Sequence, residues 1–283
     1  MEHAILLIQC PDKKGIVARV SEFIFRHDGN IINSDQYTTD PEGGRFFIRI
    51  EFYFDLLKTS RKSLQENLSA ISDALSGVAE LHFDDRPLRM GVLVSKQDHC
   101  LYDLLYLRRS GELSVEIPLV ISNHEDCRAL VESHGIPFHY LAVTKDTKAS
   151  QEKRMVQLLE KTTDFLVLAR YMQILSENFI TAYGKDVINI HHSFLPGFKG
   201  ANPYRQAYDR GVKLIGATAH YVTPQLDEGP IIEQVVDRVY YKDTVEELKR
   251  KGKNLEKLAL ANAIQAHVER RIIRMDPKTI VFQ

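Results

Sequence analysis

The stretch DVINIHHSFLPGFKGANPYRQA, residues 186–207, places polar side chains at the point where a buried strand ends. An apolar start is followed by the amide of Asn189 and then by two adjacent imidazoles, His191 and His192. A loop containing proline and glycine comes next. In open parallel sheets, ligands bind beyond the carboxyl ends of the strands. The stretch therefore predicts the edge of such a sheet and a site on it.

The sequence around this stretch has the rhythm of a doubly wound, mostly parallel α/β domain. Short, nearly continuous apolar runs alternate with helix-length segments, as expected for strands covered on both faces. The predicted strands are 90–95, 115–121, 138–143, 164–169, 186–190, 214–222 and 230–239. A long helix at 244–269 follows, and the last residues, TIVFQ, are predicted to be a short tail. The basic run KRKGK, 249–253, is predicted to be a solvated helix face, with a phosphate-binding patch as the alternative.

The first part of the chain predicts a separate ferredoxin-like module. Apolar patterns indicate strands and helices in the order βαββαβ. The predicted strands are 4–10, 30–39, 44–54 and 79–84, and the helices 16–27 and 64–75, with the turn DPEGG joining the two middle strands. The charged, proline-containing segment DDRPLR, 84–89, is the predicted linker. The sequence thus predicts two domains, 1–84 and 85–283.

Composition and charge exclude several classes of protein. Among 283 residues, 44% are hydrophobic and 27% charged, which is enough apolar sequence for a soluble protein with a sizeable core. The net charge of -1 gives no general attraction to nucleic acid or to an anionic membrane. No apolar run reaches the length of a bilayer span, and the N-terminus lacks the basic start of a signal peptide. Three widely spaced cysteines, Cys10, Cys100 and Cys127, favour a reducing cytoplasm without disulfides.

Asn189 and His191 are the candidate catalytic pair. They are two residues apart on a strand, so their side chains point to the same side, and amide and imidazolium donors suit a carbonyl that becomes an oxyanion. The loop within IGATAHYVTPQLDEGPIIEQ, 215–234, adds Asp227, a carboxylate that could pair with His191, keep it charged and hold a water molecule. For the Asn–His pair taken alone, the commoner explanation is polar residues that begin a loop. Asp227 could equally belong to an ordinary turn.

A metal site and a serine hydrolase are both disfavoured by spacing. His191 and His192 are adjacent, so on a strand they point to opposite faces, and no H-x-x-x-H or C-x-x-C accompanies them. Ser193 lies in no G-x-S-x-G motif. His220 precedes the Asp227 loop and is either a pocket residue or a half-buried strand residue. The sequence predicts no metal.

Three separated motifs, NIHHSFLP, GATAHYV and LDEGPIIEQ, resemble the folate-dependent formyltransferase family. The resemblance covers about residues 90–240. In that family an Asn-x-His at a strand end and an Asp in a following loop form the catalytic trio. The resemblance therefore implies that Asn189, His191 and Asp227 are the catalytic residues.

The segment LVLARYMQIL, 166–175, is similar to the folate pocket of this family. The resemblance implies that backbone groups around Met172, Gln173, Ile174 and Leu175 receive the pterin, with His220 as a further candidate lining residue. Gln173 departs from the purine-synthesising transferase, which has an arginine there. The folate substrate, 10-formyltetrahydrofolate, is the only small molecule that this chemistry implies, without any further cofactor.

The N-terminal module, with DKKGIVARVSEFI as its loop and first helix, resembles an ACT domain. An ACT domain before a formyltransferase domain is similar to the hydrolytic branch of the family. This implies hydrolysis of 10-formyltetrahydrofolate to formate and tetrahydrofolate, which supplies formate for purine synthesis and balances the one-carbon folate pool. The ACT resemblance also implies a homo-oligomer and a small amino-acid effector near residues 12–16 and 31–37. The alternative is a module that only dimerises.

The segment VLVSKQDHCLYDLL, 92–105, favours water over a phosphorylated acceptor. It has no glycine after Gly91, and Asp98 places a negative charge near a helix start, so a phosphate would meet few free N–H groups and a like charge. Lys96 could still bind an anion. Formyl transfer to an amine such as glycinamide ribonucleotide is therefore one alternative, and a folate or amino-acid sensor without catalysis is another.

Overall fold

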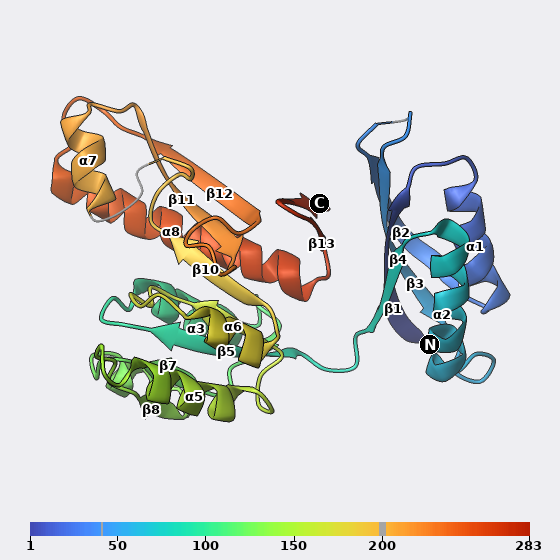
Figure 1. The fold of residues 1–283 in the computed structure, drawn as a ribbon, viewed down its shortest axis with the longest axis horizontal. Helices are drawn as coiled ribbons and strands as arrows, with labels where there is room; N and C mark the ends of the chain where they lie inside the picture. The colour runs from blue at the N-terminus through green and yellow to red at the C-terminus, as the bar shows by residue number, and fades with distance from the viewer. Residues whose placement is uncertain (41, 198–201) are drawn as a thin grey trace. The chain divides into compact units, whose positions relative to one another are not determined.

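The structure is a computed structural model that describes residues 1–40, 42–197 and 202–283 (Figure 1). One residue of the predicted turn DPEGG, at position 41, lies outside these ranges. The chain divides into two compact units. The first comprises Met1–Arg86, Glu269–Met275 and Thr279–Gln283, and the second comprises Pro87–Val268 and Asp276–Lys278. The division after Arg86 falls within the predicted linker, whereas most residues after Val268 group with the first unit and not, as predicted, with the second.

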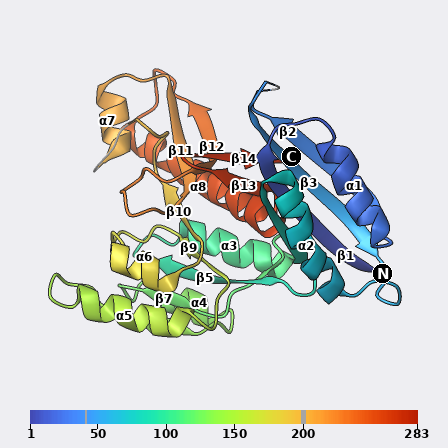
Figure 2. The ribbon, with the colours of Figure 1, turned by 45° about the vertical axis from the view of Figure 1, so that its right-hand side comes forward.

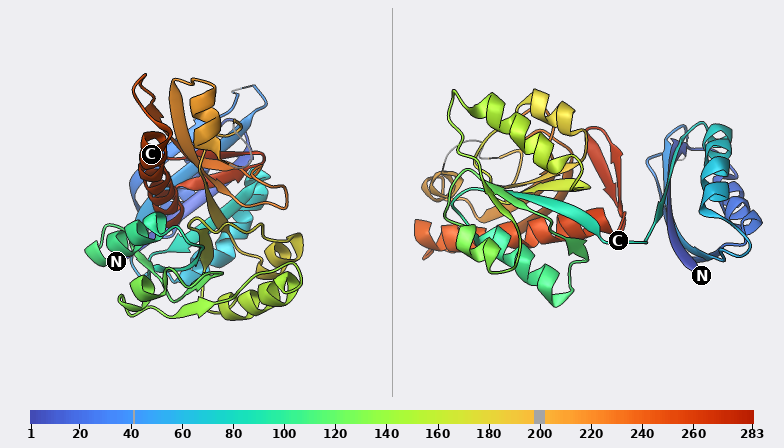
Figure 3. Two further views of the ribbon diagram at one scale, coloured as in Figure 1. Left: turned by 90° about the vertical axis from the view of Figure 1, so that its left-hand side faces the viewer. Right: turned by 90° about the horizontal axis from the view of Figure 1, so that it is seen from below.

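The first unit is a four-stranded antiparallel sheet with the order β2-β3-β1-β4, and two helices lie on one of its faces (Figure 3). The predicted βαββαβ arrangement is confirmed. Its elements are β1 (Glu2–Pro11), α1 (Ile16–Arg26), β2 (Asn30–Thr38), β3 (Arg45–Phe54), α2 (Arg61–Leu75) and β4 (Val78–Phe83). Ser60 caps α2, because its side chain accepts a hydrogen bond from the backbone N–H of Ser63 over 3.1 Å. The core under the helices includes Leu6, Ile8, Val20, Phe52 and Leu64.

A C-terminal hairpin packs against the same sheet through other residues of β1. It consists of β13 (Ile272–Met275) and β14 (Lys278–Val281), so the predicted short tail is wrong. Side chains alternate along a strand, and Ile5 and Leu7 therefore form a cluster with Phe47, Ile273 and Phe282 that is separate from the helix-side core.

The buried guanidinium of Arg49 in β3 holds the chain just before this hairpin. Its Nε donates to the carbonyl of Arg270 over 2.9 Å, and its Nη2 donates to the carbonyl of Glu269 over 2.8 Å. These are two charge-assisted hydrogen bonds to backbone oxygens, which are stronger than neutral ones. The hairpin is thereby anchored to the sheet by polar as well as apolar contacts.

The second unit is built on a sheet with the order β12-β11-β10-β9-β5-β7-β8. The strands from β10 to β8 are parallel to one another, whereas β11 is antiparallel to both of its neighbours, β10 and β12. The predicted doubly wound, mostly parallel domain is confirmed. Its strands are β5 (Leu88–Val94), β6 (Val115–Glu116), β7 (Val120–Ser122), β8 (Phe138–Tyr140), β9 (Phe165–Leu168), β10 (Val187–His191), β11 (Leu214–Tyr221) and β12 (Ile231–Arg238). Its helices are α3 (His99–Ser110), α4 (Arg128–Glu132), α5 (Lys148–Leu159), α6 (Glu177–Tyr183), α7 (Pro203–Asp209) and α8 (Val245–Val268).

The predicted strand 115–121 is interrupted in the structure. β6 ends at Glu116 and β7 begins at Val120, with Pro118 between them. Proline has no backbone N–H to give to a neighbouring strand, which explains the break. The chain also leaves β5 in one direction toward β7 and returns on the other side as β9. This reversal of strand order creates the crevice in which ligands of such sheets bind.

The long helix α8 lies along the antiparallel strands of this unit (Figure 2). Its buried face carries apolar residues at helical spacing, among them Leu248, Leu255, Leu260 and Ile264, but it also carries Glu256. None of the helices in the described ranges combines the length and the apolar character that a bilayer crossing requires.

Candidate active site

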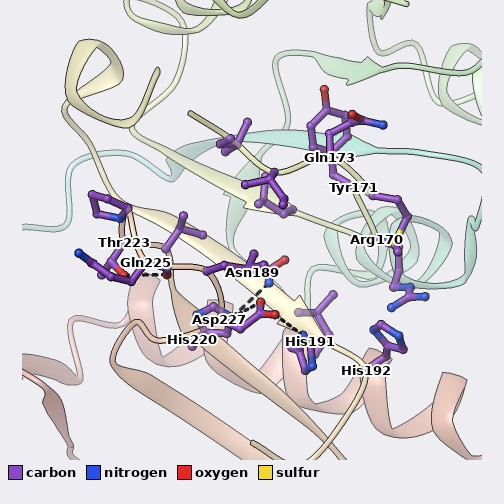
Figure 4. Close-up of a pocket in the computed structure, with 18 residues that line it drawn as sticks. Arg170, Tyr171, Gln173, Asn189, His191, His192, His220, Thr223, Gln225 and Asp227 are labelled. Carbon is purple, nitrogen blue, oxygen red and sulfur yellow. Dashed lines mark hydrogen bonds and ion pairs between the residues drawn. The ribbon is translucent and has the colours of Figure 1, made fainter. Parts of the chain in front are cut away.

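A cavity of about 240 Å³ opens at the carboxyl ends of the central strands (Figure 4). β9 ends at Leu168 and β10 ends at His191, and the residues at and after both ends line the cavity. The loop between β11 and β12 supplies the remaining lining. The lining residues are 168, 170–175, 189–192, 220 and 222–227.

The structure brings Asn189, His191 and Asp227 together at this cavity. Nδ1 of His191 lies 3.3 Å from Oδ2 of Asp227, and all three residues line the cavity. The hydrogen bond from His191 lowers the pKa of Asp227, so that carboxyl is ionised at neutral pH. Nε2 of His191 is buried and has no hydrogen-bond partner within the described residues. A buried ring nitrogen without a partner is costly, so it suits an acceptor that arrives with a ligand.

His220 pairs with Asn189 across the neighbouring strands β11 and β10 and also lines the cavity. Nδ1 of His220 donates to the backbone carbonyl of Tyr221 over 2.9 Å, and burial lowers the pKa of His220, so the ring is neutral. Its Nε2 is then an acceptor, and Nδ2 of Asn189 donates to it over 3.1 Å. The sequence pointed to His220 as a pocket residue, and its bond to Asn189 was not predicted.

The predicted folate segment lies in a loop that is held at both ends. At its start, the N–H of Met172 donates to Oγ of Ser95 over 2.9 Å, and that hydroxyl donates to Oδ1 of Asn123 over 2.7 Å. At its end, the buried carboxylate of Glu152 accepts hydrogen bonds from the backbone N–H of Ser176, over 3.0 Å, and from its hydroxyl. Residues 172–175 all line the cavity. The N–H of Met172, however, is already used by Ser95 and is not free for a ligand.

A buried ionic network at the edge of the cavity was not predicted. The carboxylate of Glu256 on α8 is 1% exposed, yet three side chains bind it. Nε2 of His99 lies 2.8 Å from one oxygen, Nε of Arg170 lies 3.3 Å from the same oxygen, and the hydroxyl of Tyr204 donates to the other over 2.7 Å. Burial alone would raise the pKa of Glu256, but these partners outweigh it and the pKa is lowered. The sequence signal was a glutamate on the apolar face of α8.

Arg170 connects this network to the second histidine of the quoted stretch. It follows β9 with a positive φ of 64°, an uncommon conformation for a residue other than glycine. Burial and the nearby charge of Arg170 together lower the pKa of His192 to about 4. The two adjacent histidines therefore differ in environment: His191 faces the carboxylate of Asp227, and His192 is a neutral ring beside a cation (Figure 4).

One group of described residues has metal-ligand types close together. The ligand atoms of His99, Cys100 and Glu256 lie within 4.8 Å of one another. Burial raises the pKa of the Cys100 thiol, which therefore keeps its proton, and Arg170 and Tyr204 already bind the carboxylate. A divalent cation would have to displace these partners, so we assign no metal to this group.

Two family profiles match the two units. The Formyl transferase profile matches residues 88–264, and the ACT domain profile matches residues 4–74. The fold and the site thus define the class: a formyltransferase-type domain joined to an N-terminal ACT domain.

Relatives align with nearly the whole of this chain, across both units. The chain is 51% identical to formyltetrahydrofolate deformylase of Bacillus subtilis over 98% of this chain and 93% of that protein. It is 49% identical to formyltetrahydrofolate deformylase of a Synechocystis strain, over 99% and 98%. A crystal structure of a formyltetrahydrofolate deformylase from Pseudomonas syringae has a TM-score of 0.93 and 43% identity, over 100% of this chain and 95% of that one. The chain belongs to the formyltetrahydrofolate deformylase family.

Proposed function

We propose that the protein hydrolyses 10-formyltetrahydrofolate to formate and tetrahydrofolate. The observation that carries the proposal is the convergence of Asn189, His191 and Asp227 at one cavity, with 3.3 Å between the histidine and the carboxylate. The relatives named formyltetrahydrofolate deformylase support the same substrate. In the cell this reaction supplies formate for purine synthesis and balances the one-carbon folate pool.

The proposed mechanism uses only these side chains and water. Water attacks the formyl carbon, and the carbonyl oxygen becomes an oxyanion that accepts hydrogen bonds from Nδ2 of Asn189 and Nε2 of protonated His191. Donors of this kind each contribute roughly a hundredfold to a thousandfold in rate. Asp227 keeps His191 charged, orients the water and accepts its proton. The bond from carbon to N10 then breaks, its electron pair stays on N10, and the proton taken up by Asp227 goes to N10. The formic acid that is formed loses the second proton of the water to solvent and leaves as formate.

The unpartnered Nε2 of His191 supports this assignment of donors. It is buried with no acceptor among the described residues, whereas Nδ1 is committed to Asp227. One N–H of Asn189 is given to His220, which leaves its second N–H for the oxyanion. The pterin is proposed to bind along the loop 173–175, which lines the cavity.

The start of α3 supports hydrolysis over transfer to a phosphorylated amine. Asp98 is the residue before this helix, is exposed, and makes no capping hydrogen bond with its side chain. Its charge lies where the helix N-terminus would otherwise attract a phosphate. Water therefore remains the nucleophile.

The first unit is proposed to bind a small amino-acid effector and to pair in a homo-oligomer. The loop before α1 supports the effector site, because Gly15 opens the helix with a φ of 87° and Lys13 donates to the carbonyl of Ala74 over 3.0 Å. The protein is proposed to work in a reducing cytoplasm, which fits its three free and buried cysteines.

The decisive experiment measures free formate after mixing the purified chain with 10-formyltetrahydrofolate, with and without glycinamide ribonucleotide. Formate release that does not depend on the amine is the expected result. Formyl transfer that occurs only with the amine would replace the hydrolase with a transferase. Binding of the folate without turnover under either condition would leave a sensor.

A further inference from the structure

A second cavity, of about 540 Å³, adjoins the first across Arg170, Met172 and His192. These three residues line both cavities. The second cavity extends from them toward α7 and α8, where Tyr204 and Lys249 are among its lining residues. The reacting centre of the proposed hydrolysis therefore has an adjacent space on the side of His192 that does not face Asp227.

The charge of the second cavity is strongly one-sided. Four cationic side chains line it, and the only carboxylate lining it within the described residues is that of Glu256. Lys249 and Lys253 are one helical turn apart on α8, both are exposed, and neither forms an ion pair within the described ranges. The remaining cations are Arg170 and Arg205. The basic run that was predicted to be a solvated face thus forms part of a cavity wall.

The carboxylate and the two arginines of the second cavity already have partners of opposite charge. Glu256 is bound by His99, Arg170 and Tyr204, and Arg205 pairs with Asp209 over 3.0 Å. This leaves the two lysines of α8 as the cations without a carboxylate partner among the described residues. A small anion would meet them at the open side of the cavity.

We propose that the second cavity binds formate, the anionic product, as it leaves the reacting centre. This inference rests on the proposed hydrolysis. Hydrolysis creates a negative charge next to Asp227, which is itself ionised, and two like charges that are close together repel each other. Lys249 and Lys253 attract the same charge from the other side of His192. The His192 ring lies between Asp227 and the two lysines and, because it is neutral, adds no charge of its own.

The test measures the binding of ¹³C-formate to the full chain in the absence of folate. Binding is monitored through the broadening of the formate NMR signal. The double variant Lys249→Gln/Lys253→Gln is expected to weaken formate binding about tenfold, because two attractive charges are lost. Arg250→Gln is the matched control, since Arg250 is exposed on the same helix but does not line the cavity. Inhibition of the hydrolysis by added formate should weaken by the same factor, with each variant's rate without added formate as its own reference.

Equal formate affinity in the double variant and in the Arg250→Gln control would overturn the proposal. So would a titration in which inorganic phosphate binds at the lysines and formate does not, because the cavity would then serve a phosphorylated molecule. Binding and turnover are read separately. If the chain does not hydrolyse the folate but the double variant still loses formate binding, only the proposed function is refuted. If the chain hydrolyses the folate normally and the double variant binds formate as before, only this inference is refuted.

Discussion

The side-chain N–H of Asn189 donates to Nε2 of His220 over 3.1 Å, and His220 is in turn fixed by the carbonyl of Tyr221. A side-chain amide can face either way unless its partners distinguish nitrogen from oxygen. Because the neutral ring of His220 offers only an acceptor at Nε2, it holds the nitrogen of Asn189 on that side. His220 is thereby a positioning residue for the proposed oxyanion donor.

We therefore expect His220→Phe to lower kcat about tenfold with little change in KM, since one buried hydrogen bond is lost and the donor is no longer oriented. His220→Gln keeps an acceptor that Asn189 can reach and should recover part of the rate. Steady-state kinetics of both variants make the comparison. Equal losses in the two variants would show that only the volume of the ring matters.

Replacement of the proposed catalytic groups should remove turnover without unfolding the chain. Asn189→Ala, His191→Ala and Asp227→Asn are each expected to lower kcat roughly a hundredfold or more, because each removes a donor or the carboxylate that orients one. Formate release gives the rate, and circular dichroism with thermal unfolding gives the fold. A variant that keeps near-normal turnover would lose its assigned role.

The loop 170–175 should act mainly on substrate binding. Ser95→Ala removes the acceptor for the N–H of Met172, and we expect KM to rise about fivefold to tenfold with a smaller change in kcat, as for one lost hydrogen bond. Ser114→Ala, at an exposed serine of the same unit, is the control. A Ser95→Ala enzyme with an unaltered KM would mean that the loop keeps its shape without this contact.

The environment of His192 predicts a pH dependence of stability. Burial and Arg170 lower its pKa from 6.5 to about 4, with a smaller contribution from His191 in the same direction and opposing ones from Glu256 and Asp227. Between those two pH values the unfolded chain binds a proton that the folded chain does not, so stability falls as the pH drops from 6.5 toward 4. The expected loss from this one group is about 3 kcal/mol.

His192→Asn lacks the titrating ring and is expected to lose correspondingly less stability over the same pH range. Urea unfolding of both proteins at several pH values between 7 and 4 measures the difference. Identical pH profiles would show that His192 does not titrate in the way its surroundings indicate.

The C-terminal hairpin should contribute substantially to the stability of the first unit. Ile273 is 6% exposed in the cluster with Ile5 and Phe47, and Ile273→Ala is expected to cost about 2 to 4 kcal/mol of unfolding free energy. Val281→Ala, at a residue that is 37% exposed, should cost far less. Equal denaturation midpoints for the two variants would argue that the hairpin does not support the sheet.

The parallel sheet was predictable because its signal is local, whereas the proposed trio was predicted from the family resemblance, since Asp227 comes from a separate loop. Continuous apolar runs mark strands buried on both faces, and Asn189 and His191 lie where such a run ends. The network around Glu256 was not predictable in the same way, because its partners come from α3, α7 and the end of β9. The hairpin was missed because each of its strands has only four residues, too few for alternation to stand out. Pro118 is the sequence signal for the break within 115–121, although the residues around it are apolar.

The hairpin also affects how the chain can be made and divided. The sheet of the N-terminal unit completes its second apolar face with Ile273 and Phe282, so a ribosome must have passed residue 282 before that face can be covered. The module therefore cannot mature ahead of the domain that follows it. For the same reason, a fragment ending at residue 86 would expose Ile5, Leu7 and Phe47 to water. The ACT module could therefore not be transplanted as a simple N-terminal piece.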